Sequence, residues 1–179
     1  MRKFGILMVF LLAVPTAAFA KGELLFWGVQ AGSTDYHVEQ TDKVTLTTIS
    51  GRLGWDVFPW LAIEARALTS GSASNNTGIS DLSIAYMGSA FARFSLAASR
   101  STRVKLYALG GYSIGQLRYT ESGVDKHFNA NGVSYGAGVE LYADDNNGIN
   151  FEWCRLVDAS DSGKNYTINQ FALGYVHRF

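Results

Sequence analysis

The last nine residues of the chain, 171–179, alternate in the way that an extended strand with two different faces requires. One face carries large apolar side chains and one histidine, namely Phe171, Leu173, Tyr175, His177 and Phe179. The other face carries Gln170, Gly174 and Arg178, with the smaller Ala172 and Val176. A chain end usually frays unless something ties it down. An aromatic last residue is explained if the strand ends at a lipid–water interface, where rings anchor membrane strands.

The first twenty residues have the pattern of a secretory signal. Arg2 and Lys3 form a basic head, residues 4–14 are almost wholly apolar, and Ala18 and Ala20 fit the small-x-small cleavage rule. The alternative is a retained membrane anchor, but the apolar run is about half of the ~20 residues that a spanning helix needs. We therefore predict a signal peptide at 1–20 and one mature domain at 21–179, exported to the cell outer membrane.

Composition limits what the mature chain can be. Loss of Arg2 and Lys3 leaves 13 basic against 15 acidic residues, which gives no basis for nucleic-acid binding. No apolar stretch after residue 20 is long enough for a spanning helix. Only helices and closed barrels satisfy every backbone group in lipid, so a membrane form of this chain must be a closed barrel. The single cysteine, Cys154, excludes an internal disulfide and is interpreted as a small strand residue.

Eight segments alternate with a period of two and are separated by turn-rich stretches. Longer polar connections and short ones also alternate, which is the arrangement of outer-membrane barrels. This predicts an all-β, eight-stranded, antiparallel up-and-down barrel. The expected strands are 24–36, 44–57, 61–69, 81–94, 103–120, 133–142, 148–157 and 166–179; the expected long loops, exposed outside the cell, are 37–43, 70–80, 121–132 and 158–165; the expected tight turns are 58–60, 97–101 and 144–148.

The two faces of the strands predict which side meets lipid. Charges of both signs share one face with glycines, which suits the narrow lumen of an eight-stranded barrel. We expect an ion-pair network in that lumen, formed by Arg52, Arg66 and Arg93 with Glu64, Glu140 and Glu152. A charge on the lipid face would cost ~2–4 kcal/mol near the midplane. In the fourth segment the face with Leu82, Ile84, Tyr86, Ala90, Ala92 and Phe94 is expected to point outward, although Met87 and Phe91 disturb the opposite face.

Aromatic residues on the apolar face are expected to form girdles near the strand ends. Their exposure to water would be unfavourable, which counts against a soluble barrel with the same alternation. The predicted girdle residues are Trp27, Trp55, Trp60, Tyr112, Trp153, Tyr175 and Phe179.

Four segments resemble small outer-membrane β-barrel proteins of Gram-negative bacteria: 18–20, 134–141, 150–153 and 174–179. The chain is similar to outer-membrane protein X, the attachment–invasion proteins, the opacity proteins and the barrel of outer-membrane protein A. The resemblance implies that the barrel-assembly machinery reads the terminal strand through Phe171, Leu173, Tyr175 and Phe179, and that lipids including lipopolysaccharide surround the barrel. His177 departs from the family pattern, which more often has an apolar residue there.

Candidates for catalysis are few. His37 and His127 are expected near loops on the outer side, with Asp35, Ser122, Asp125 and Asp161 as neighbours, so an enzyme acting on lipid A or peptides with a loop histidine as base is one alternative. No zinc spacing, calcium loop or phosphate-binding loop is present, and no cofactor is expected. Eight strands leave no water-filled bore, so porin activity is not expected.

The leading hypothesis is a non-enzymatic barrel with a structural or surface-interaction role in adhesion or envelope integrity. A second alternative is a secreted soluble barrel that binds an apolar ligand.

Overall fold

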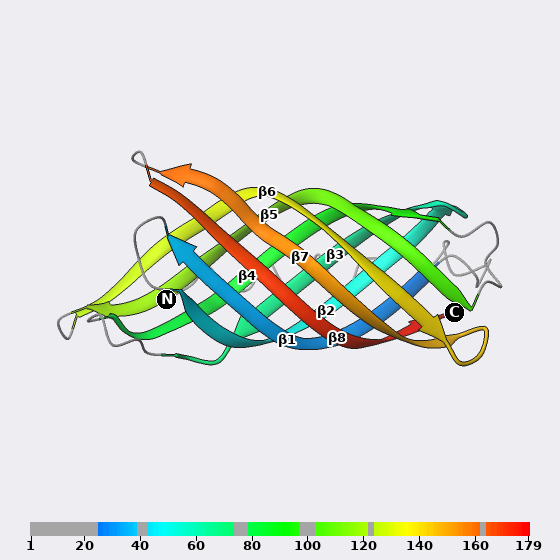
Figure 1. The fold of residues 1–179 in the computed structure, drawn as a ribbon, viewed down its shortest axis with the longest axis horizontal. Coiled ribbons are helices and arrows are strands. Elements are labelled where there is room, and N and C mark those ends of the chain that lie inside the picture. The colour runs from blue at the N-terminus through cyan, green and yellow to red at the C-terminus, as the bar shows by residue number, and fades with distance from the viewer. Residues whose placement is uncertain (1–24, 39–42, 74–78, 97–102, 122–123, 162–163) are drawn as a thin grey trace, which may run out of the picture.

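The structure is a computed structural model that describes residues 25–38, 43–73, 79–96, 103–121, 124–161 and 164–179. Eight strands follow one another along the described chain (Figure 1). They are β1 (Leu25–Val38), β2 (Val44–Phe58), β3 (Leu61–Ser70), β4 (Ile79–Ser95), β5 (Val104–Glu121), β6 (Val124–Tyr142), β7 (Asn147–Asp161) and β8 (Lys164–Arg178). Among these residues no helix is long and apolar enough to cross a membrane.

Each strand pairs with its neighbour in sequence, and the sheet closes on itself. The closing pair is β1 with β8, which runs antiparallel from Phe26 opposite Arg178 to Val38 opposite Tyr166. All eight pairings are antiparallel, so the barrel has up-and-down topology. The predicted fold class is therefore confirmed. Closure removes the exposed edges that an open sheet would present to lipid.

The two ends of the barrel differ. One end, called the turn end below, holds the β2–β3 turn at Pro59 and Trp60, the β6–β7 turn at 143–146, and the start of β1. The last residue is tied down there, because the backbone N–H of Phe179 donates to the Leu25 carbonyl at 3.1 Å. The opposite end is called the loop end.

The β6–β7 turn is held by the carboxylate of Asp144. It accepts from the backbone N–H of Asn146 at 2.8 Å and of Asn147 at 2.6 Å. Hydrogen bonds from the Asn147 side chain, then from these two backbone groups, hold the pKa of Asp144 below its ordinary value of 3.8.

A lowered folded-state pKa means that the turn gains stability when Asp144 is ionised, and loses it as the pH falls through that pKa. In an NMR titration of the barrel in lipid nanodiscs, we expect the Asn146 and Asn147 amide signals to shift with a midpoint below 3.8. Asp144→Asn should abolish this transition. A midpoint at or above 3.8 in the unaltered protein would contradict the assignment.

The strands at the loop end are longer than the sequence pattern predicts. The expected loops at 121–132 and 158–165 are wrong in extent, because β6 already begins at Val124, β7 continues to Asp161 and β8 begins at Lys164. The polar residues that indicated loops are strand residues in a hairpin, for example Thr120 opposite Asp125. Of the other two expected loops, 37–43 overlaps the end of β1 by two residues and β2 by none, and 70–80 overlaps β3 by one residue and β4 by two.

The prediction of which side chains point outward is also wrong for the first part of β4. Leu82 and Ile84 were expected to point outward, but both are buried inside the barrel, while Tyr86 is exposed. Register shifts between Ser80 and Ser83, and between Ile84 and Tyr86, insert extra residues into the pairing with β5. A bulge of this kind reverses the alternation beyond it.

The outer wall is apolar from the turn end to about the middle of each strand. The side chains on this part of the wall, called the apolar band below, include Trp27, Val29, Ile49, Leu53, Trp55, Ile63, Tyr86, Phe94, Val104, Leu106, Tyr112, Ile114, Val133, Tyr135, Leu141, Ile149, Phe151, Phe171, Leu173 and Tyr175. Beyond the apolar band the outward positions become polar, at Thr45 and Thr47, Gln116 and Arg118, Asn129 and Asn131, and Asn169. A membrane strand needs only ~9–11 residues to cross, whereas β6 has 19. The surplus length forms a wall that stands beyond the lipid.

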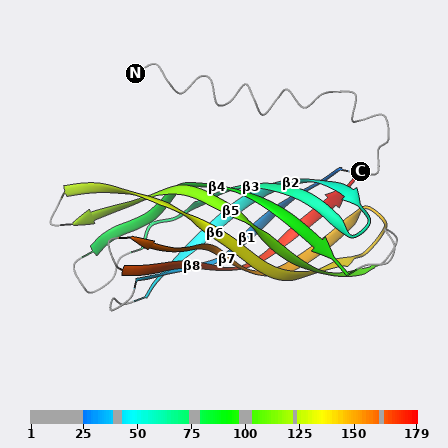
Figure 2. The same ribbon diagram turned by 90° about the horizontal axis from the view of Figure 1, so that it is seen from above.

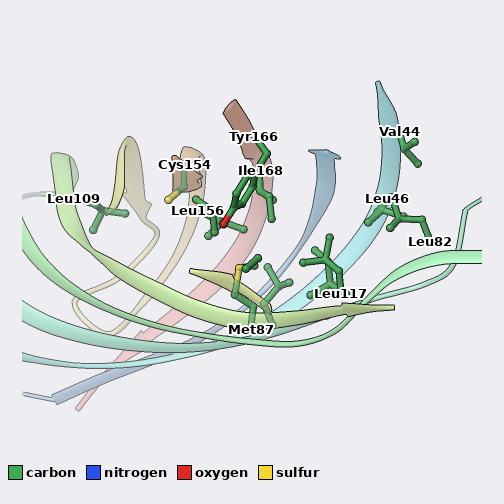
Figure 3. Close-up of a cluster of buried hydrophobic side chains, with 14 of the residues drawn as sticks. Val44, Leu46, Leu82, Met87, Leu109, Leu117, Cys154, Leu156, Tyr166 and Ile168 are labelled. Atoms are coloured by element: carbon green, nitrogen blue, oxygen red, sulfur yellow. The ribbon is translucent and has the colours of Figure 1, made fainter. Parts of the chain in front are cut away.

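The interior changes in the opposite sense. Toward the turn end it is ionic, and toward the loop end it is a buried apolar cluster (Figure 3). This cluster includes Val44, Leu46, Leu82, Ile84, Leu117, Leu156, Tyr166 and Ile168. The loop-end part of the barrel therefore has the polarity of a soluble protein, with apolar side chains inside and polar ones outside, since water surrounds it.

Candidate functional site

The six predicted lumen residues lie together in the turn-end half of the barrel, where alternation on β2, β3, β4, β6 and β7 points them inward. Arg52 on β2 contacts Glu140 on β6 at 2.9 Å across the lumen, and Arg93 contacts the same carboxylate at 2.6 Å. Arg66 contacts Glu64 at 2.5 Å and Glu152 at 2.7 Å. All six side chains are nearly inaccessible to solvent. Buried charges are tolerated only when paired in this way.

The network also includes residues that were not predicted as members. Arg178 on β8 pairs with Asp56 on β2 and lies 3.7 Å from Glu140. The hydroxyls of Tyr107 and Tyr142 donate to Glu152 and Glu140, each at 2.8 Å. Asp56 and Arg178 share the inward parity with the predicted members, which is the sequence signal that could have identified them. The tyrosines gave no such signal, because a tyrosine fits either face.

An aromatic ring lies at the centre of these charges. Phe26 is fully buried, and the guanidinium groups of Arg52, Arg93 and Arg178 lie 5.9, 5.2 and 5.3 Å from its ring centroid. The ring fits because Gly54 faces it; a Cβ at Gly54 would come within 2.1 Å of the ring. Side chains from opposite walls thus meet in the lumen at this level.

The predicted girdle residues separate into two groups. Trp27, Trp55, Trp60, Tyr175 and Phe179 gather around the turn end. Tyr112 and Trp153 are not near strand ends; each lies about halfway along its strand, near the other limit of the apolar band. The reason is that these strands continue beyond the lipid, so the membrane boundary and the strand end do not coincide.

The candidate catalytic residues are not brought together. His37 on β1 and His127 on β6 are separated around the wall by β7 and β8. Asp35 is bonded instead to Lys43 and Thr45, and Asp125 to Thr120. Ser122 lies outside the described residues, as does the side chain of Asp161. In the described part of the chain no group of three or more metal-ligating side chains occurs.

At the loop end the wall opens between β6 and β7. The pairing of these strands stops at Val133 opposite Asp158, while β6 continues to Val124 as the partner of β5 alone. The β5–β6 hairpin therefore runs beyond the β7–β8 hairpin and apart from it (Figure 1, Figure 2). Within the described residues, 124–132 of β6 pair with β5 on one side and form an edge with no paired strand on the side toward β7.

The direction of the backbone groups on this edge follows from the turn-end pairing. The N–H of Tyr142 donates to Arg103 on the β5 side, and the N–H of Ala143 donates to Asn147 on the β7 side. The register of β6 with β5 is unbroken, so odd-numbered residues of β6 direct their backbone groups toward the β7 side. The N–H and C=O groups of Asp125, His127 and Asn129 thus face the open edge. We call residues 124–132 the β6 edge.

A family model described as "Outer membrane protein beta-barrel domain" matches residues 4–179, which is nearly the whole chain. The chain belongs to this family. It is accordingly an outer-membrane β-barrel protein, and the predicted location is confirmed. The alternative of a secreted soluble barrel is wrong, because the apolar band of this outer-membrane barrel faces lipid; only the loop-end section has soluble-type polarity.

Solved outer-membrane barrels have the same fold. Neisserial surface protein A (NspA) superposes with a TM-score of 0.71 at 13% identity, covering 87% of this chain and 97% of that one. Ail, the attachment invasion locus protein of Yersinia pestis, gives 0.64 at 13% identity, covering 88% and 99%. The N-terminal barrel domain of Pseudomonas aeruginosa OprF gives 0.59 at 10% identity, covering 85% and 97%. At these identities the likeness concerns the fold. No curated protein matches the sequence significantly.

Proposed function

We propose that this outer-membrane barrel is a non-enzymatic surface-interaction protein that binds partners at its loop end. The observation that carries the proposal is the β6 edge, which extends beyond the apolar band and, among the described residues, has no strand paired on its β7 side. In outer-membrane barrels the short turns face the periplasm and the opposite end faces outside. The β6 edge would then project from the cell surface.

The chemistry of an open edge defines the mode of binding. Unpaired backbone N–H and C=O groups accept an extended segment of another protein as an additional strand. Asp125, His127 and Asn129 would supply these groups, and their side chains are exposed on the outer face. Alternate side chains of the added segment would point inward, toward Phe128 and Tyr166, whose rings lie edge-to-face at 5.3 Å. A segment with alternating apolar and polar residues therefore fits best.

The structural neighbours are consistent with a role at the surface. NspA is named a surface protein and Ail an attachment invasion protein, and one Ail structure contains the heparin analogue sucrose octasulfate. For this chain, strand addition at the β6 edge is the form of attachment that the wall geometry favours.

The test uses a phage-displayed library of extended peptides with alternating apolar and polar positions. The library is selected on the barrel in nanodiscs. Asn129→Pro removes one backbone N–H of the β6 edge. That N–H points away from β5, so its loss breaks no hydrogen bond to β5, and proline is tolerated on strand edges. We expect the selected peptides to bind the unaltered barrel and Asn129→Ser, but to bind Asn129→Pro at least about tenfold more weakly. Absence of enriched peptides, or equal binding to both variants, would contradict the proposal.

For assembly we propose that the terminal strand β8 is the segment recognised by the barrel-assembly machinery. Its outward-facing residues Phe171, Leu173, Tyr175 and Phe179 are all exposed on the wall, in the order that the family resemblance implies.

A further inference from the structure

A shallow hollow of about 500 Å³ lies on the outer wall across β1, β7 and β8. The side chains of Phe151, Trp153, Phe171 and Leu173 stand around it, and the small Ala31 leaves it open. Register places Ala31, Leu173 and Phe151 side by side, so the hollow runs across three neighbouring strands. Because this part of the wall belongs to the apolar band, hydrocarbon fills the hollow in a membrane.

The cationic side chain of Arg155 lies directly beyond this hollow, toward the loop end. Arg155 follows Trp153 by two residues on β7 and therefore points to the same outer face. Its guanidinium donates to the Asn169 side chain at 2.9 Å, to the Tyr135 hydroxyl at 3.0 Å and to Asp158 at 3.1 Å. The Tyr135 ring in turn packs edge-to-face on Trp153 at 6.1 Å. The guanidinium is thus held in place above the aromatic rim of the hollow.

The height of Arg155 distinguishes it from the other cations. Among the described residues, no lysine or arginine points outward within the apolar band. On β5 the first outward cation is Arg118, four residues beyond Ile114. On β7, Arg155 lies one outward position beyond Trp153, the last outward apolar residue of that strand, and its cross-strand partner on β6 is Tyr135. Its side chain is 29% exposed and its partner Asp158 is 43% exposed, so a headgroup can reach it.

We propose that this hollow and Arg155 form a binding site for lipid A, with one acyl chain in the hollow and a lipid phosphate on the Arg155 guanidinium. Arginine binds phosphate through parallel charge-assisted hydrogen bonds, which suits the planar group that Asn169 and Tyr135 orient. The exposed pair of Arg155 with Asp158 is of the kind that contributes little in water, so a phosphate can replace it. The site lies on the lipid-facing wall and is separate from the β6 edge.

The test measures lipid binding to the folded barrel in detergent by native mass spectrometry. Three probes are compared: lipid A, the same lipid A with its phosphates removed, and phosphatidylglycerol. The variants are Arg155→Gln, Ala31→Phe to fill the hollow, and Arg118→Gln as the control that removes an outward cation elsewhere. Gel mobility before and after boiling shows that each variant is folded.

We expect lipid A to bind the unaltered barrel at least about tenfold more tightly than dephosphorylated lipid A, since one charged hydrogen-bond pair accounts for that factor. Phosphatidylglycerol also has a phosphate, so its weaker binding would show that the site is specific for lipid A. Arg155→Gln and Ala31→Phe should each lose most of this preference, and Arg118→Gln should keep it. Equal binding of the dephosphorylated lipid or of phosphatidylglycerol would overturn the proposal, as would an unchanged Arg155→Gln. The comparison of probes on the unaltered barrel decides the question even if a variant does not fold.

Discussion

Replacing Glu140 with glutamine is expected to lower the free energy of unfolding by about 3–5 kcal/mol, the usual cost of removing one partner from a buried ion pair. Glu140 pairs with Arg52 at 2.9 Å and with Arg93 at 2.6 Å, and it accepts from the Tyr142 hydroxyl. Without the carboxylate, both buried guanidinium groups lose their nearest counter-charge. Urea unfolding of the barrel in lipid vesicles, followed by tryptophan fluorescence, measures the change.

Two controls separate this loss of pairing from general damage. Asp35→Asn removes an acidic partner of Lys43 at the exposed loop end, and it should cost no more than about 1 kcal/mol. Combining Glu140→Gln with Arg93→Met should recover part of the loss, because the second change removes a charge that the first leaves uncompensated. If Glu140→Gln stays within about 1 kcal/mol of the unaltered protein, the lumen network does not contribute as argued.

The second large effect concerns the outer wall. Leu53 on β2 points outward in the apolar band, between Trp27 and Ala65 on the neighbouring strands. Leu53→Arg places a charge in hydrocarbon one outward position from Trp55 of the turn-end girdle. It is expected to destabilise the folded barrel by ~1–3 kcal/mol, between the costs of an interfacial and a midplane charge. The same urea unfolding experiment in vesicles measures it.

A matched control lies on the same strand and the same face. Thr47 is six residues from Leu53 and belongs to the polar wall beyond the apolar band. Thr47→Arg should change stability by no more than ~1 kcal/mol, because its side chain meets water or headgroups. Equal losses for the two variants would show that the apolar band ends elsewhere on β2.

The β6 edge and the Arg155 site place two different interactions at the same end of the barrel. The edge offers backbone groups to a partner outside the membrane, and the Arg155 site offers a cation and an apolar hollow to a lipid at its boundary. Each can be removed by a substitution that does not touch the other. Asn129→Pro and Arg155→Gln are therefore informative about separate proposals.

Much of the barrel could be predicted because alternation is a local property. The parity of Arg52, Glu64 and Glu140 is visible in their own strands, and closure brings those strands around one lumen. The same reasoning did not extend to Leu82 and Ile84, since the bulges in β4 depend on its pairing with β5. The polar residues at 125–131 also gave no sign of being a strand, because a strand surrounded by water has the composition of a loop.

The sequence by itself determined the number of strands, their two faces, and the separation of charged from apolar side chains between those faces. A period of two distinguishes one face from the other wherever a strand has no bulge, but it says nothing about height along the barrel. Only the tertiary structure decided where the wall leaves the lipid, because pairing register sets each residue's level. At that level the surrounding medium changes from hydrocarbon to water, and the inner and outer faces exchange polarity for that reason.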